Sequence, residues 1–228
     1  MSAPLRLVIF DVDGTLVDSQ NSIVSAMTAA FQTVDLEVPG RADILSIVGL
    51  SLDHAMARLV PGVSDTARAE LVTAYKNSFM SRRTAEGAAA LAPLYPGAAE
   101  VLTQLQAIPE MLLGVATGKS QRGLDKLIEA HGWEQTFLTR QVADHHPSKP
   151  HPSMIHAAMD EMGVGPEDTV MIGDTSFDMD MAHAAGVPGI GVGWGYHDKS
   201  ALGRASRIID RFEELPGALD EMWSKANV

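Results

Sequence analysis

The 228-residue sequence contains no cysteine, which excludes disulfide bonds and thiolate chemistry. A chain without disulfides fits a reducing compartment, so we expect a cytoplasmic protein. Basic residues are also scarce, because 17 lysines and arginines stand against 29 acidic residues and give a formal net charge of -12. A sequence-independent nucleic-acid binder needs a basic surface, so we expect no nucleic-acid partner.

The sequence has no long apolar run, since none approaches the roughly 20 residues that a membrane-spanning helix requires. We therefore expect no membrane partner. The short apolar segment 5–10 near the N-terminus stops at Asp11. It predicts a strand, because a signal peptide needs a longer apolar core and a small-residue cleavage site.

Short apolar runs that end at a small or acidic residue recur along the chain, and segments with helical spacing lie between them. These runs occupy residues 5–10, 111–116, 168–174, 187–193 and 207–210. Strands that alternate with helices predict an α/β fold, a doubly wound parallel sheet with helices on both faces. Such sheets bind ligands beyond the carboxyl ends of their strands, where we expect Asp11, Thr117 and Asp174.

The segment between the first and second strands has a different pattern. Apolar residues follow a helical period over 22–34, around 55–60 and over 66–80, and strand signals are scarce. This predicts a helical cap domain at residues 17–92, inserted into a core domain made of residues 1–16 and 93–228. A cap above the carboxyl ends of the strands is well placed to act as a lid.

Several acids follow the predicted strands. Asp11 and Asp13 come after the first, and Asp174 and Asp178 come after the third. Carboxylates gathered at one end of a sheet are costly unless a positive charge neutralises them. Oxygen ligands, with no cysteine and no regular histidine spacing, favour Mg²⁺ over zinc.

The same acids could be reactive. A carboxylate can act as a nucleophile and form an aspartyl-phosphate, while a neighbouring carboxyl group moves protons. Phosphoryl transfer further requires small donors and a fixed cation. Thr117, the amides around Gly118 and Lys149 are candidates for these parts.

Four segments together resemble the motifs of one family. FDVDGTLVDS, ATGKS, the Lys149-Pro150 pair and GDTSFDMDMA are similar, in order and context, to the four motifs of the haloacid dehalogenase (HAD) superfamily, phosphatase branch. The predicted cap after the first motif resembles that of the phosphoglycolate phosphatase-like subgroup. The resemblance covers nearly the whole chain and implies a Mg²⁺-dependent phosphatase that acts on a small phosphorylated metabolite.

The resemblance also implies a role for each motif residue. Asp11 would be the nucleophile and Asp13 the general acid and base. The Mg²⁺ ligands would be Asp11, the main-chain carbonyl of Asp13 and Asp174, with Asp178 in support. The phosphoryl group would contact Thr117, the following amide at Gly118 and Lys149.

The core motifs leave other functions open. Asp13 favours phosphate esters, because relatives that cleave carbon–halogen bonds lack this acid, but phosphoglycolate and sugar phosphates both remain candidate substrates. A phosphomutase of the β-phosphoglucomutase type would share the first chemical step. A non-catalytic phosphate-binding module is a further alternative, although it would not need both acids. The sequence predicts no oligomeric state.

Some residues outside the motifs also carry expectations. We expect a substrate-specificity loop in the segment 47–53, and we expect Trp194 and Gly195 to shape a wall of the site. Ser153 stands where relatives often have an acid that caps a helix, and it is expected to cap instead. Cationic cap residues could meet a substrate anion, although such side chains are usually solvated: these are Arg58, Lys76, Arg82 and Arg83. A histidine metal site at His145, His146 and His151 is not favoured.

Overall fold

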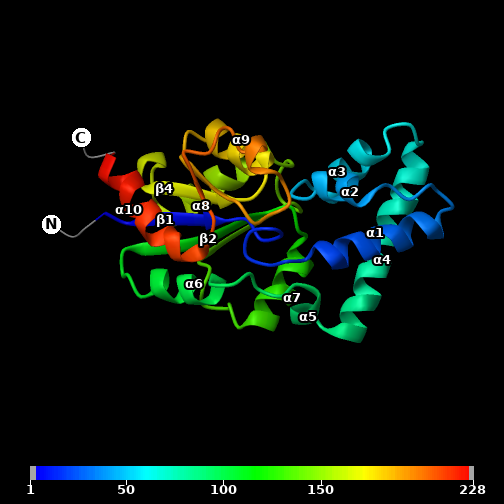
Figure 1. Cartoon of the computed structure of the whole chain (residues 1–228), viewed down its shortest axis with the longest axis horizontal. Helices are drawn as coiled ribbons and strands as arrows, with labels where there is room; N and C mark the ends of the chain where they lie inside the picture. The colour runs from blue at the N-terminus through cyan, green and yellow to red at the C-terminus, as the bar shows by residue number, and fades with distance from the viewer. Residues whose placement is uncertain (1–3, 226–228) are drawn as a thin grey trace.

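The computed structural model describes residues 4–225 and is built around a six-stranded sheet (Figure 1). The strand order is β3-β2-β1-β4-β5-β6, and every neighbouring pair is parallel. The strands are β1 (Arg6–Phe10), β2 (Met111–Thr117), β3 (Thr139–Val142), β4 (Thr169–Gly173), β5 (Gly189–Val192) and β6 (Arg207–Ile209). The predicted α/β fold is thereby confirmed.

Helices cover both faces of the sheet because β1 is apolar on both sides. Val8 and Phe10 belong to one buried cluster, whereas Leu7 and Ile9 belong to another. The first cluster includes residues of α6 (Ala98–Gln106), α7 (Gln121–His131) and α10 (Leu215–Lys225). The second includes residues of α8 (Ser153–Met162) and α9 (Ser176–Ala184).

The order of the strands determines where a ligand can bind. The strand β1 pairs with β2 on one side and with β4 on the other, and Phe10 is in register with both Val115 and Ile172. The chain therefore changes direction across the sheet at β1, and the carboxyl ends of these three strands meet at one edge. A crevice at such a switch point is the usual ligand site of a doubly wound sheet.

Five helices lie beyond this edge of the sheet (Figure 1). They are α1 (Gln20–Thr33), α2 (Arg41–Ser46), α3 (Leu52–Leu59), α4 (Asp65–Glu86) and α5 (Ala88–Leu91). The apolar faces of α1, α2, α3 and α4 form a third buried cluster that includes Phe31, Ile44 and Leu71, each 0% exposed. Over residues 4–225, no helix combines the length and apolar character needed to cross a membrane.

We propose that residues 17–92 form a cap domain and that residues 1–16 and 93–228 form the core domain. Most buried apolar residues of the segment 17–92 belong to the cap cluster, which supports this division, although Val17 and Ala92 at its two ends belong to a cluster on the sheet.

The division predicts how the protein opens. Phe31→Ala should destabilise the cap by about 3–5 kcal/mol, because it leaves a cavity in the cap cluster. Hydrogen exchange should become faster across residues 17–92 while the amides of β1, β2 and β4 keep their protection. An equal increase in the strands would show that cap and core open as one unit and would contradict the division.

Candidate active site

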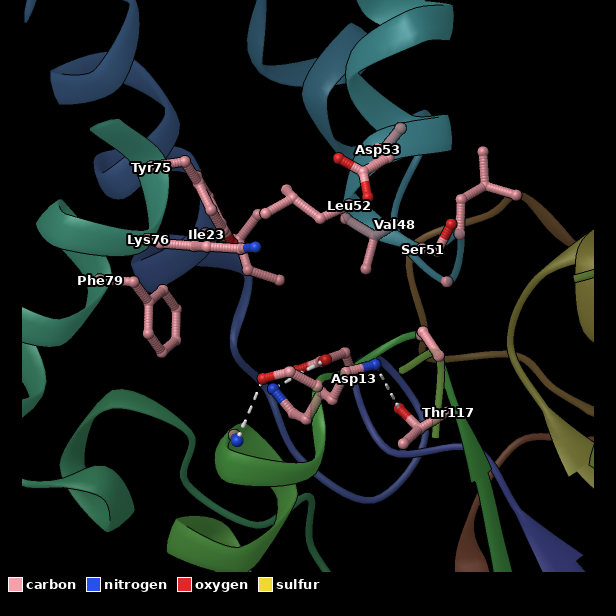
Figure 2. A pocket seen from close by; sticks show the side chains of 18 of the residues that line it. Asp13, Ile23, Val48, Ser51, Leu52, Asp53, Tyr75, Lys76, Phe79 and Thr117 are labelled. Carbon is pink, nitrogen blue, oxygen red and sulfur yellow. Dashed lines mark hydrogen bonds and ion pairs between the residues drawn. The ribbon is translucent and has the colours of Figure 1, made fainter. Parts of the chain in front are cut away.

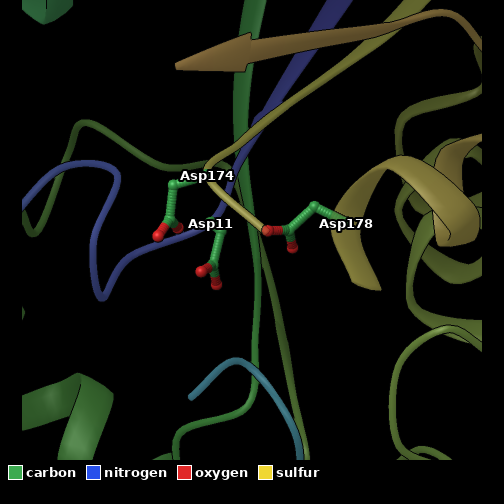
Figure 3. Close-up of side chains that lie close together, drawn as sticks. All are labelled: Asp11, Asp174 and Asp178. Atoms are coloured by element: carbon green, nitrogen blue, oxygen red, sulfur yellow. The ribbon is translucent and has the colours of Figure 1, made fainter. Parts of the chain in front are cut away.

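Three carboxylates converge at the edge of the sheet (Figure 3). Asp11 follows β1, Asp174 follows β4 and Asp178 lies in the first turn of α9. One oxygen from each lies within 4.8 Å of the others, and all three residues are at most 1% exposed. The strand ends therefore bring these predicted residues together.

Lys149 is the cation within this cluster. Its Nζ lies 2.7 Å from Asp11 Oδ1 and 2.6 Å from Asp178 Oδ1, and the residue is 2% exposed. Burial alone would lower the pKa of this ammonium, but the charges of Asp11 and Asp178 outweigh burial and raise it. Lys149 thus stays charged, although one ammonium cannot balance three carboxylates.

Burial, together with the excess of negative charge, raises the pKa values of Asp11 and Asp174. Burial raises the pKa of Asp11 to about 7, against the attraction of Lys149. Burial, and then the charges of Asp178 and Asp11, raise the pKa of Asp174 well above its usual value. Asp11 Oδ1 contacts the Lys149 ammonium, whereas Asp11 Oδ2 has no hydrogen-bond partner among the described residues.

The other two acids have fixed partners. Asp174 accepts hydrogen bonds from Thr15 Oγ1 at 3.0 Å and from the Tyr196 amide at 2.8 Å. Both oxygens of Asp178 are engaged, Oδ1 with Lys149 and Oδ2 with the amide and hydroxyl of Thr175. Asp178 is therefore suited to holding Lys149 and the start of α9, whereas Asp11 and Asp174 keep lone pairs for a cation.

Two glycines allow the chain to pass close to Asp174. A Cβ at Gly195 would lie 2.0 Å from the Cβ of Asp174, and one at Gly14 would lie 2.2 Å from its Oδ2. Gly14 also has a φ of 86°, which side chains other than hydrogen rarely tolerate. The position of Asp174 thus depends on the absence of side chains at both sites.

The Asp13 side chain lies outside the carboxylate cluster. It forms an ion pair of 2.8 Å with Lys119 Nζ and accepts a hydrogen bond from Ser19 Oγ. Asp13 and Thr117 lie on the core side of a pocket that faces the cap (Figure 2). An acid that is separate from the cluster and open to this pocket can exchange a proton with a bound ligand.

The pocket has a volume of about 430 Å³ and lies between core and cap. Asp11, Thr117 and Gly118 line its core side, and the segment 47–53 lines its cap side, as expected for a specificity loop. The two sides approach closely, because a Cβ at Gly118 would lie 2.6 Å from the carbonyl oxygen of Leu50.

The four cap cations differ in position. Lys76 and Arg83 line the pocket. Arg82 instead pairs with Glu86, and the guanidinium of Arg58 lies over the ring of Phe177. Only two of the four candidates therefore border the space where a ligand would lie.

The loop around Lys149 holds no histidine cluster with metal-binding geometry among residues 4–225. His146 contacts Gln141 and Ser153 through its two ring nitrogens. The prediction that Ser153 caps α8 is wrong, because its hydroxyl contacts His146 and the helix begins without a side-chain cap. Pro152 precedes the helix, and Ser153 is its first residue rather than its cap.

Two site residues were not identified from the sequence. Lys119, which holds Asp13, follows Gly118 directly, and a lysine at a strand end was the available signal. Tyr196 accepts a hydrogen bond from the Ser19 amide through its hydroxyl and donates its own amide to Asp174. The expected neighbours of the site, Trp194 and Gly195, contact Thr15 and Asp174.

Comparison with known proteins agrees with this geometry. Residues 8–192 match the family described as haloacid dehalogenase-like hydrolase. The chain belongs to this family. The match spans the sheet from β1 to β5, all of the cap helices and every residue of the carboxylate cluster.

Similar proteins identify the kind of hydrolase. The chain is 36% identical to "Probable phosphatase IndB" of Dickeya dadantii, over 93% of this chain and 92% of that protein. It is 29% identical to the phosphoglycolate phosphatase of Escherichia coli, over 87% and 85% of the two chains. This HAD protein is a phosphatase.

The fold is shared more widely. The structure of a β-phosphoglucomutase from Clostridium difficile matches with a TM-score of 0.82 at 18% identity, covering 97% of this chain and 98% of that one.

The close approach of Gly195 to Asp174 can be tested with a matched pair of variants. Gly195→Ala should lower phosphatase activity at least tenfold, because the new methyl group displaces Asp174. Gly203→Ala is the control, since no atom lies within 4 Å of its added Cβ, and it should retain activity. Phosphate release measures both, and full activity of Gly195→Ala would contradict the role expected of Asp174 as a cation ligand.

Proposed function

We propose that this phosphatase requires Mg²⁺ and hydrolyses a small phosphorylated metabolite through an aspartyl-phosphate on Asp11. The observation that carries the proposal is the position of Asp11, which belongs to the buried carboxylate cluster and also lines the pocket. A nucleophile between the carboxylate cluster and the pocket can contact a bound cation and a bound ligand at the same time.

The donor set fits a divalent cation. Asp11 has an unpaired oxygen, and Lys149 neutralises only one of the three carboxylates. A divalent cation would compensate the two remaining negative charges. Asp11, Asp174 and the main-chain carbonyl of Asp13 would hold it, and Asp178 would support it. Carboxylate oxygens without nitrogen or sulfur ligands favour Mg²⁺. When bound, the ion would neutralise charge on the phosphoryl oxygens.

The chain's own residues would carry out two chemical steps. A carboxylate oxygen of Asp11 attacks phosphorus, the ester P–O bond breaks, and Asp13 gives a proton to the leaving oxygen. A water then attacks the phosphorus of the acyl phosphate and gives a proton to Asp13. This hydrolysis releases phosphate and restores the Asp11 carboxylate. Thr117, the Gly118 amide and Lys149 would hold the phosphoryl oxygens.

The candidate substrates are phosphoglycolate and sugar phosphates. A relative that covers most of the chain is named phosphoglycolate phosphatase, which makes this compound the first to test. Closure of the cap would exclude bulk water from the reaction. A cytoplasmic location is part of the same proposal, and the absence of cysteine supports it.

The proposal predicts the effect of removing each acid. Asp13→Asn should lower the rate by about 10²- to 10⁴-fold because proton transfer is lost, and Asp11→Asn should be at least as severe. Asp180→Asn is the matched control, because this acid lies on α9 and pairs with Arg204 at the surface. The measurement is phosphate release from a metabolite panel, with Mg²⁺ and with chelator. Equal activity of Asp11→Asn and Asp180→Asn would contradict the role of Asp11.

A phosphomutase remains the second candidate, because the fold matches that of a β-phosphoglucomutase. Such an enzyme would release little phosphate and would convert a sugar monophosphate once a trace of the bisphosphorylated sugar is present. Phosphate release without this activation would favour the phosphatase. A phosphate-binding module would bind phosphate without turnover and would tolerate Asp13→Asn.

A further inference from the structure

We infer that the alcohol part of the substrate is apolar, so that the enzyme prefers phosphate esters of aliphatic or aromatic alcohols over phosphoglycolate and sugar phosphates. This inference rests on the proposed function. It concerns the part of the pocket that lies beyond the phosphoryl group.

The apolar region is continuous with the proposed site of chemistry. Asp11, Asp13 and Thr117 line the same pocket as residues of α1, α3 and α4. Figure 2 shows Asp13 and Thr117 on one side and the cap side chains across from them. An ester whose phosphorus lies next to Asp11 therefore extends its alcohol part toward the cap.

The cap contributes mainly hydrocarbon surface to the pocket. Three separate segments supply it, with Ile23 from α1, Val48 and Leu52 from the α2–α3 region and Phe79 from α4 (Figure 2). Leu52 and Phe79 are only partly buried by the protein itself. A ligand that covers them removes further apolar surface from water, which is favourable.

The cap side of the pocket carries three charged residues, Asp53, Lys76 and Arg83, and its neutral polar side chains are Ser51 and Tyr75. The hydroxyl of Ser51 contacts His54 Nδ1 at 3.0 Å, and its amide donates to Ser148 Oγ at 2.9 Å. Burial and the charge of Asp13 raise the pKa of Tyr75, so its hydroxyl stays neutral and can offer a ligand one hydrogen-bond donor. A sugar carries several hydroxyls, and each one that loses water without a partner weakens binding.

Lys76 and Arg83 are the features that would favour an anionic substrate such as phosphoglycolate, because both line the pocket. The Lys76 side chain points toward the interior of the pocket (Figure 2). Glycolate is too small to fill a pocket of about 430 Å³, whose size falls in the range of roughly 300–1,000 Å³ that is typical for larger ligands. It would leave most of the apolar wall uncovered.

The test is a series of primary alkyl phosphates, from ethyl to hexyl phosphate, compared with 2-phosphoglycolate and glucose 6-phosphate. Leaving-group basicity is nearly constant along the alkyl series, so differences in kcat/KM report contact with the pocket. Each methylene that becomes buried should raise kcat/KM by up to about fourfold, which corresponds to ~0.8 kcal/mol. Hexyl phosphate should then exceed both polar substrates.

A matched pair of variants locates the effect. Leu52 and Leu59 are both partly buried leucines of α3, but Leu52 lines the pocket and Leu59 does not. Leu52→Ala should lower kcat/KM for hexyl phosphate roughly tenfold and leave ethyl phosphate nearly unchanged. Leu59→Ala should preserve the dependence on chain length.

The outcomes separate this inference from the proposed function. Turnover of phosphoglycolate or glucose 6-phosphate, with no rise along the alkyl series, would overturn the inference and leave the phosphatase mechanism intact. A rise that Leu52→Ala and Leu59→Ala affect equally would also overturn it, because the contact would then lie elsewhere. Phosphate release that persists unchanged in Asp11→Asn would overturn the proposed function itself.

Discussion

The ion pairs of Lys149 with Asp11 and Asp178 are the interaction on which the rest of the site depends. They bring together the end of β1, the loop before α8 and the first turn of α9, and all three side chains are almost completely buried. Removing the ammonium would leave buried carboxylates without a counter-charge, which is strongly destabilising. Asp174 adds a third carboxylate to the cluster, so the site retains a negative excess that suits a divalent cation.

The core and cap are joined at the same place. Ser19 lies just before α1, and its amide and hydroxyl contact Tyr196, whose own amide donates to Asp174. Lys119 forms an ion pair with Asp13, and its ammonium also lies 5.9 Å from the ring centroid of Phe79 on α4. The proposed acid and cation ligands therefore share contacts with the segments that connect or face the cap. A shift of the cap would therefore move the Asp13 side chain through its contacts with Ser19 and Lys119.

Much of the fold could be predicted because the central strands are continuous apolar runs. The edge strand β3 was missed, since its Arg140 and Gln141 are only half-buried and break the apolar pattern. Convergence of Asp11 and Asp174 follows from their positions at strand ends, and Asp178 joins them from the first turn of α9. The contacts of Lys119 and Tyr196 could not be predicted in this way, because they depend on how loops distant in the sequence meet across the edge of the sheet. The apolar character of the pocket could not be predicted either, because it depends on how three separate cap segments come together around the pocket.

The central claim is that the buried cluster is completed by a divalent cation, and urea unfolding with and without Mg²⁺ tests it most directly. With Mg²⁺ at 100 times its dissociation constant, the free energy of unfolding should rise by about 2.7 kcal/mol. The rise should persist in Asp180→Asn and should largely disappear in Asp174→Asn. A free energy of unfolding that is the same with and without Mg²⁺ in the unmodified protein would contradict the claim.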